Sequence, residues 1–191
     1  MIRTELEKGN LKVLGEITLQ YFGYPADAPE LDPLYKLASE FDVPLHIHLA
    51  GLGGTPDFPI ELGNPLRLAK VLNKYSNLRI YIENASWPFL EEVTSLMYTY
   101  PNVYADLSTI TWVIPRKTFH AYLEGLIENG LEKRLMFGSD AMQWPEATEL
   151  AIESVEAADF LTEGQKRDIF YNNAARFFRL IDEEIKQHHG N

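Results

Sequence analysis

Five short apolar segments recur along the chain, separated by stretches in which apolar residues repeat with helical spacing. The segments span 11–17, 43–49, 78–82, 103–107 and 134–137. They are rich in Val, Ile, Leu and Tyr and do not alternate cleanly with polar residues, which is typical of strands covered on both faces of a parallel sheet. The pattern therefore predicts five strands, each followed by a helix.

Helix starts are marked at several places between these segments. Asp32-Pro33 and Asn64-Pro65 each place a capping side chain before a proline at the first helical position. After the fifth strand we expect two helices, the second opened by the capping box of Thr162 and Gln165. Repeated β–α units favour an α/β fold with parallel strands and right-handed crossovers, plus an extra C-terminal helix. No Ser- or Gly-rich linker divides the chain, so we expect one domain.

Composition narrows the class of partner and the compartment. Seventeen Lys and Arg against 28 Asp and Glu give a formal net charge of −11, which argues against binding to nucleic acid or to an anionic membrane. Cysteine is absent, so disulfides and thiol chemistry are excluded. No apolar run reaches membrane-spanning length, and the first residues lack a signal-peptide core. These observations favour a cytoplasmic protein.

Polar residues collect where the predicted strands end. Ligands of parallel α/β sheets meet the carboxyl ends of the strands, so residues at these ends are the first candidates for chemistry. They are Glu16 on the first strand, His46 and His48 on the second, Glu83 and Asn84 after the third, Asp106 and Ser108 at the fourth, and Asp140 after the fifth.

His46 and His48 are two residues apart on one strand, so their side chains point the same way. If they point inward they could bind a divalent metal, with Asp140 and Glu16 supplying carboxylate oxygens. Such a mixed site suits Zn²⁺, Mn²⁺ or Fe²⁺. Under the alternative hypothesis, His46 is a hydrogen-bonded core histidine one layer below the rim.

Three tryptophans follow strand ends on the same predicted face: Trp87, Trp112 and Trp144. Together with Ser108 they could wall a pocket that excludes water from a planar or acidic organic substrate. They could equally clamp neighbouring loops against each other.

Several motifs together resemble the amidohydrolase-related metal-dependent hydrolases, a group that includes aminocarboxymuconate-semialdehyde decarboxylase-like enzymes. The similarity runs from about residue 5 to residue 180. We therefore expect a partial barrel domain at 1–180 and a polar C-terminal tail at 181–191. The matching segments are Val-Leu-Gly-Glu-Ile (13–17), Val-Pro-Leu-His-Ile-His (43–48), Gly-Asn-Pro-Leu (63–66), Pro-Asn-Val-Tyr-Ala-Asp-Leu-Ser (101–108), Lys-Arg-Leu-Met-Phe-Gly-Ser-Asp (133–140) and Asn-Asn-Ala-Ala-Arg-Phe (172–177).

The resemblance implies a (β/α)₈ TIM barrel with a metal at the carboxyl ends of its strands. It assigns His48 and Asp140 as metal ligands, to which Glu16 and His46 could add. The implied activity is hydrolysis or decarboxylation of a small organic, aromatic or carboxylated substrate.

The sequence departs from the family pattern in two ways that affect metal binding and proton transfer. The first strand resembles the family's fourth, so three strands and their His-x-His ligands are missing. Asn84 stands where the family has a histidine base, and an amide cannot take a proton near neutral pH.

Three hypotheses follow from these departures. The chain is a metal-dependent enzyme completed by another chain or segment, a degenerate member that binds a small molecule or partner subunit without turnover, or a fragment of a longer protein. The missing strands also leave two open sheet edges, so we expect a homo-oligomer, a chain supplying strands, or edges covered by loops and helices.

Overall fold

The computed structural model describes residues 1–189 and contains a sheet of five parallel strands in the order β1-β2-β3-β4-β5. The predicted parallel sheet, with its strands in chain order, is confirmed. The strands are shorter than the apolar segments that predict them: β1 (Leu14–Ile17), β2 (Leu45–Ile47), β3 (Ile80–Ile82), β4 (Val103–Asp106) and β5 (Leu135–Met136).

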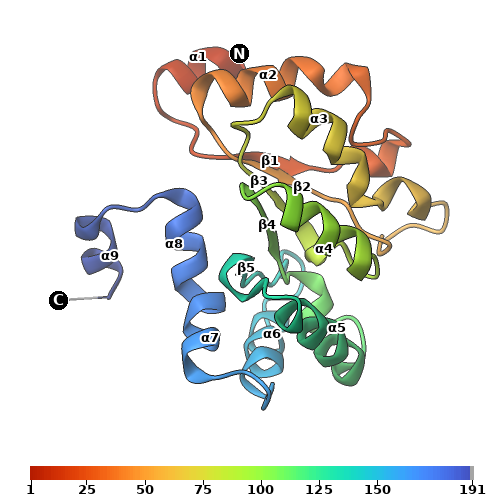
Figure 1. Cartoon of the computed structure of the whole chain (residues 1–191), viewed down its shortest axis with the longest axis vertical. Coiled ribbons are helices and arrows are strands. Elements are labelled where there is room, and N and C mark those ends of the chain that lie inside the picture. Colours follow the sequence, from red (N-terminus) through yellow and green to blue (C-terminus); the bar gives the residue numbers. More distant parts are fainter. Residues whose placement is uncertain (190–191) are drawn as a thin grey trace.

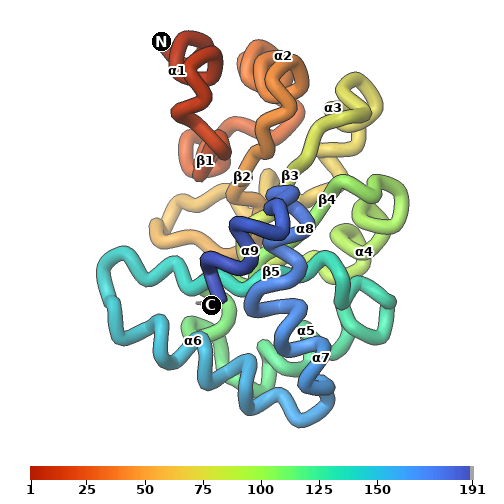
Figure 2. Tube along the Cα trace, turned by 90° about the vertical axis from the view of Figure 1, so that its left-hand side faces the viewer, coloured from red at the N-terminus to blue at the C-terminus, as the bar shows by residue number. Residues whose placement is uncertain are grey.

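Helices alternate with the strands along the chain (Figures 1 and 2). Their bounds are α1 (Ile2–Glu7), α2 (Asp32–Phe41), α3 (Leu68–Lys74), α4 (Leu90–Thr99), α5 (Arg116–Glu128), α6 (Ala147–Glu156), α7 (Glu163–Arg167), α8 (Asn173–Phe178) and α9 (Asp182–His189). A π-helical segment, Asp168–Asn172, joins α7 to α8. No helix among the described residues combines the length and apolar character needed to cross a membrane.

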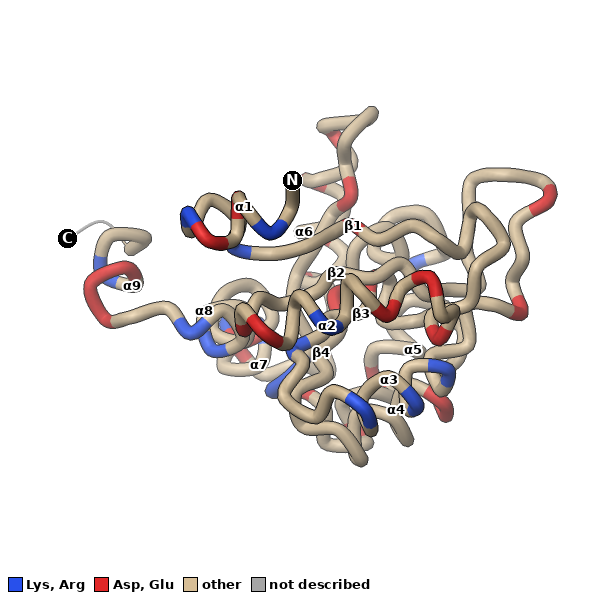
Figure 3. The backbone as a smooth tube through the Cα atoms, turned by 90° about the horizontal axis from the view of Figure 1, so that it is seen from above, with Lys and Arg blue, Asp and Glu red and all other residues tan. Residues whose placement is uncertain are grey.

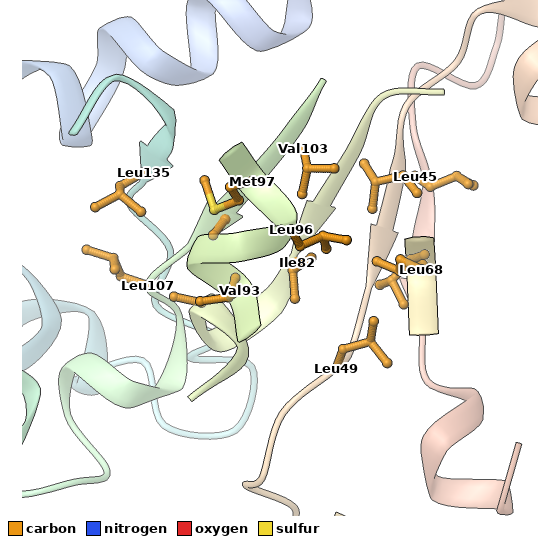
Figure 4. Close-up of a cluster of buried hydrophobic side chains, with 14 of the residues drawn as sticks. Leu45, Leu49, Leu68, Ile82, Val93, Leu96, Met97, Val103, Leu107 and Leu135 are labelled. Carbon is orange, nitrogen blue, oxygen red and sulfur yellow. The ribbon is translucent and has the colours of Figure 1, made fainter. Parts of the chain in front are cut away.

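The hydrophobic core lies between the sheet and the helices that cover one of its faces. Leu45, Ile80 and Val103 lie side by side in the strand register and have no exposed surface. Val93 and Met97 of α4 are equally buried, and Figure 4 shows α4 lying against these strands. The predicted alternation of strand and helix thus buries one continuous apolar layer.

On the opposite face, an aromatic row crosses the strands. Tyr81 and Tyr104 occupy the register positions beside His46, and Phe177 of α8 packs on both tyrosine rings, with centroid distances of 5.5 and 4.8 Å. Helix α8 therefore lies across the face of the sheet that α2 to α5 leave open, as Figure 1 shows.

The two edges of the sheet differ. The free edge of β5 is covered, because the amide of Phe137 donates to the Ile169 carbonyl at 2.8 Å and the Asn173 side chain donates to the Leu135 carbonyl at 2.6 Å. On β1, the other edge strand, Gly15 and Glu16 are exposed. The expectation that both edges are covered holds at β5 and not at β1.

The chain ends in an exposed helix rather than an irregular tail. In α9, acidic residues occupy the first turn and basic residues the last, an order that complements the helix dipole (Figure 3). Residues 190–191 of the predicted tail lie outside the described residues.

Candidate metal centre

Three ionisable side chains converge where β1, β2 and β3 end. Glu16 is on β1, His48 directly follows β2 and Glu83 directly follows β3. Nδ1 of His48 lies 3.2 Å from Oε1 of Glu16 and 2.8 Å from Oε2 of Glu83. One ligand atom of each residue falls within 4.8 Å of the other two, which is a spacing that can hold a metal ion.

The strand register explains the convergence. Ile47 pairs with Ile82, so the next residue on each strand, His48 and Glu83, leaves the sheet at the same level. Ile17 pairs with Ile47 across an irregularity in the β1–β2 register, and this brings Glu16 to the same corner. His48 and Glu83 are 5% and 2% exposed, so both polar groups need partners inside the protein.

A backbone carbonyl fixes which ring nitrogen of His48 carries a hydrogen. Nε2 lies 3.1 Å from the carbonyl oxygen of Leu52, which can only accept, so Nε2 carries a hydrogen. Nδ1 therefore faces two carboxylates as either a protonated nitrogen or a lone pair. Three acceptor atoms without a hydrogen between them repel one another, and the cluster is satisfied only by a proton or a cation.

The pKa values of Glu16, His48 and Glu83 are shifted by burial and by the hydrogen bonds among the three side chains. The hydrogen bond to His48 lowers the pKa of Glu16 to about 2. Burial raises the pKa of Glu83 to about 8, with Glu16 adding to the rise and His48 opposing it. Burial alone would lower the pKa of His48, but hydrogen bonds to Glu16 and Glu83 outweigh it and raise the pKa to about 10. Protons thus occupy the positions where a divalent cation would sit.

The donor set fits such a cation. Two carboxylates and one imidazole suit Mn²⁺ or Zn²⁺, since neutral imidazole nitrogen and carboxylate oxygen are ligands for both. The Leu52 carbonyl holds the second ring nitrogen, an arrangement that orients metal-binding histidines.

A cavity of about 280 Å³ opens beside the cluster on the α8 side of the sheet and is lined by both carboxylates. His46 also lines it, stacked on Tyr81 with ring centroids 4.2 Å apart and with Nε2 3.2 Å from Oδ2 of Asp106. Burial opposes protonation of His46, but Asp106 outweighs it and raises the pKa. Asp106 also accepts from the Ser108 hydroxyl. His46 is therefore tied to Asp106 and is not a member of the Glu16–His48–Glu83 cluster.

A second cavity, of about 420 Å³, lies on the other side of His48. His48, Asn84 and Asp140 line it, so the two residues expected to share a rim do share a cavity. Trp112 and Trp144 form part of the wall, with ring centroids 6.1 Å apart. Asp140 accepts from the Thr109 hydroxyl at 2.6 Å and lines both cavities, but it is outside the three-residue cluster.

The residues predicted to wall one pocket, Trp87, Trp112, Trp144 and Ser108, do not all line the same cavity in the structure. Trp112 donates from Nε1 to the Ser139 carbonyl at 2.6 Å while lining the cavity, so it both walls the pocket and clamps a loop. Trp87 packs against the hydrophobic core and does not line the second cavity. Ser108 lines the first cavity instead of the second.

Glu83 is the functional candidate that sequence reasoning passed over as a ligand. It follows directly after an apolar strand, at the position equivalent to His48, and this equivalence is the feature that could have found it.

Residues 10–180 match the family of amidohydrolases. The chain belongs to the amidohydrolase family. Its strands are parallel and alternate with helices, and it matches part of a TIM barrel of known structure. The family resemblance seen in the sequence motifs is thus confirmed.

Three proteins of known name or structure are similar to this chain. Protein fluG of Emericella nidulans is 26% identical over an alignment of 155 positions, and the match covers 73% of this chain and 18% of that protein. An uncharacterized TIM-barrel protein, Bb4693 of Bordetella bronchiseptica, superimposes with a TM-score of 0.72 at 20% identity over 92% of this chain and 60% of its own.

A 5-carboxyvanillate decarboxylase of Novosphingobium aromaticivorans, complexed with manganese and 4-hydroxy-3-methoxy-5-nitrobenzoic acid, superimposes with a TM-score of 0.64 at 21% identity. The match covers 93% of this chain and 60% of that one. The chain thus spans less than two thirds of the length of each of these three proteins.

Proposed function

We propose that this chain binds one divalent metal ion through Glu16, His48 and Glu83 and acts on a small carboxylated aromatic compound. The observation that carries the proposal is the cluster of one imidazole between two carboxylates, in which Nδ1 of His48 lies 2.8 Å from Glu83 and 3.2 Å from Glu16. A cluster of this kind needs a positive charge at its centre, and two cavities adjoin it.

The reaction class follows from the family and from this chain's own groups. A bound divalent cation would supply Lewis-acid polarisation of a substrate oxygen, as used in hydrolysis and decarboxylation. The aromatic walls of the larger cavity exclude water and orient a planar ring. The Asp140 carboxylate, held at Oδ2 by Thr109, keeps Oδ1 available to accept a proton. The manganese-bound aromatic acid decarboxylase relative supports Mn²⁺ and an aromatic acid for this chain.

The test combines metal binding with turnover. Protein stripped with a chelator is titrated calorimetrically with MnCl₂ and separately with ZnCl₂, and one ion per chain is expected. The loaded protein is then incubated with a panel of aromatic carboxylates and their amides, following carbon dioxide release for decarboxylation and amine release for hydrolysis. Failure to bind either metal in a stoichiometric amount would contradict the proposal.

A second candidate function is binding of such a compound without turnover. The observation that favours it is Asn84, whose amide cannot exchange protons at the position where the family resemblance expects a base. Under this hypothesis the loaded protein binds aromatic acids but releases neither product.

A further inference from the structure

The side-chain oxygen of Asn84 is buried without a hydrogen-bond partner among the described residues. The residue is 1% exposed, and its Oδ1 atom makes no hydrogen bond to any described residue. Because a buried polar group is costly to leave unpaired, each one in a folded protein calls for an explanation such as a function, an ion or a bound molecule. Because Asn84 lines the 420 Å³ cavity, a ligand in that cavity is within reach of the amide.

Hydrogen bonds to neighbouring residues fix the backbone around Asn84 in an unusual conformation. Asn84, Ala85 and Ser86 all have left-handed φ values, of 59°, 45° and 57°, a conformation that asparagine tolerates better than most residues. The amide nitrogen of Asn84 donates to Oδ1 of Asp106 at 3.4 Å, and the hydroxyl of Tyr122 donates to the Ala85 carbonyl at 2.8 Å. Strain of this kind persists where the surroundings fix a functional group.

The rest of the cavity indicates the shape of the ligand. Tyr21, Trp112 and Trp144 line it, and the Tyr21 ring meets His48 edge-on at 5.0 Å between centroids. A volume of about 420 Å³ lies in the range of pockets for small organic molecules. Aromatic walls that alternate with polar side chains fit a planar ring whose substituents reach Asn84, Asp140 and His48.

We propose that Asn84 determines specificity by hydrogen bonding to a hydroxyl substituent on the planar ligand of this cavity. The inference rests on the proposed function in taking that ligand to be the substrate. A hydroxyl both donates and accepts, so it satisfies the amide in either orientation of its oxygen and nitrogen. A ring that lacks the hydroxyl leaves the amide unpaired, and sites with buried hydrogen-bonding groups reject such analogues strongly.

The test measures how Asn84→Gly changes the preference for hydroxylated rings. The probes are benzoate and 2-, 3- and 4-hydroxybenzoate, titrated into manganese-loaded protein while tryptophan fluorescence reports binding near Trp112 and Trp144. For the native chain, the best hydroxybenzoate should bind about five to ten times more tightly than benzoate. In the glycine variant, which tolerates the left-handed φ, this preference should fall below twofold while benzoate binding changes little.

Asn84→Asp provides a second variant that also tolerates the left-handed backbone. Its carboxylate still accepts from a hydroxyl, so the preference should survive, while every benzoate binds more weakly because of charge repulsion. An unchanged preference in Asn84→Gly, or no preference in the native chain, would overturn the assignment. Manganese titration of the same samples separates the two proposals: metal binding without a hydroxyl preference refutes only the role of Asn84, whereas absence of metal binding refutes the proposed metal centre.

Discussion

Nδ1 of His48 and Oε2 of Glu83 lie 2.8 Å apart, and both side chains are almost fully buried. They leave neighbouring strands at the same level because Ile47 and Ile82 are paired. A contact this close between buried ionisable groups holds a proton in the absence of metal and a cation in its presence.

Glu83→Gln should weaken Mn²⁺ binding by at least tenfold. The amide keeps the size of the side chain but removes one anionic ligand from the cluster, and even indirect partners of metal ligands are worth 10–100-fold in affinity. Calorimetric titration measures the change. The matched control is Glu91→Gln, which removes the same charge from the exposed start of α4 and should leave the affinity within about twofold. Equal affinities of the two variants would refute the role of Glu83.

Metal affinity should rise with pH between 6 and 8. The pKa of Glu83 is raised to about 8 and that of His48 to about 10, so both hold protons at pH 6 that a metal must displace. Displacement of one or two protons makes the affinity grow by about tenfold to hundredfold per pH unit. Titrations at pH 6, 7 and 8 give the slope, and an affinity independent of pH would show that the metal binds elsewhere.

Gly63→Ala should destabilise the fold by about 1–3 kcal/mol or more. A Cβ atom at this position would lie 2.2 Å from the Ala50 carbonyl oxygen, and backbone cannot easily move away. Gly54→Ala is the control, because a Cβ there meets no heavy atom within 4 Å. Urea unfolding should place the control within about 1 kcal/mol of the native chain; a loss as large as that of Gly63→Ala would show that steric contact is not the cause.

Asn173→Ala should cost about 1–3 kcal/mol of unfolding free energy. The buried amide donates to the carbonyls of Leu135 and Glu132 at 2.6 and 2.7 Å and so secures the edge of β5. Asn10→Ala, which removes an exposed amide bonded to Glu5, should cost no more than about 0.5 kcal/mol. Chemical denaturation compares the two, and a similar cost for both would mean that the edge contact adds no stability.

The order and direction of the strands could be predicted from the sequence because short, mostly apolar segments recur at the spacing of β–α units. The Thr162 capping box predicts a helix start and is present in the structure. Asp32-Pro33 also marks the start of a helix, but the prediction that Asp32 caps it is wrong, because Asp32 is the first helical residue of α2 and its side chain makes no capping hydrogen bond. Both features are local, so they can be recognised without knowledge of tertiary packing.

The grouping of the site residues could be predicted only in part. Glu16 and His48 were paired correctly as neighbours, but the choice of Glu83 over His46 depends on strand register. Ile47 faces Ile82 and not a residue one position away, and a shift of one residue would send Glu83 to the other side of the sheet. Neither composition nor spacing determines this shift.

Because its two edges differ, the sheet can accept a further strand at one edge only. Because the segment that leads into α8 closes the side of β5, a further strand from any polypeptide can hydrogen-bond only alongside β1. Such a strand would run directly past Glu16. Any addition to the sheet would therefore change the solvent exposure of one carboxylate in the proposed metal centre, which would couple assembly at that border to the affinity for the ion.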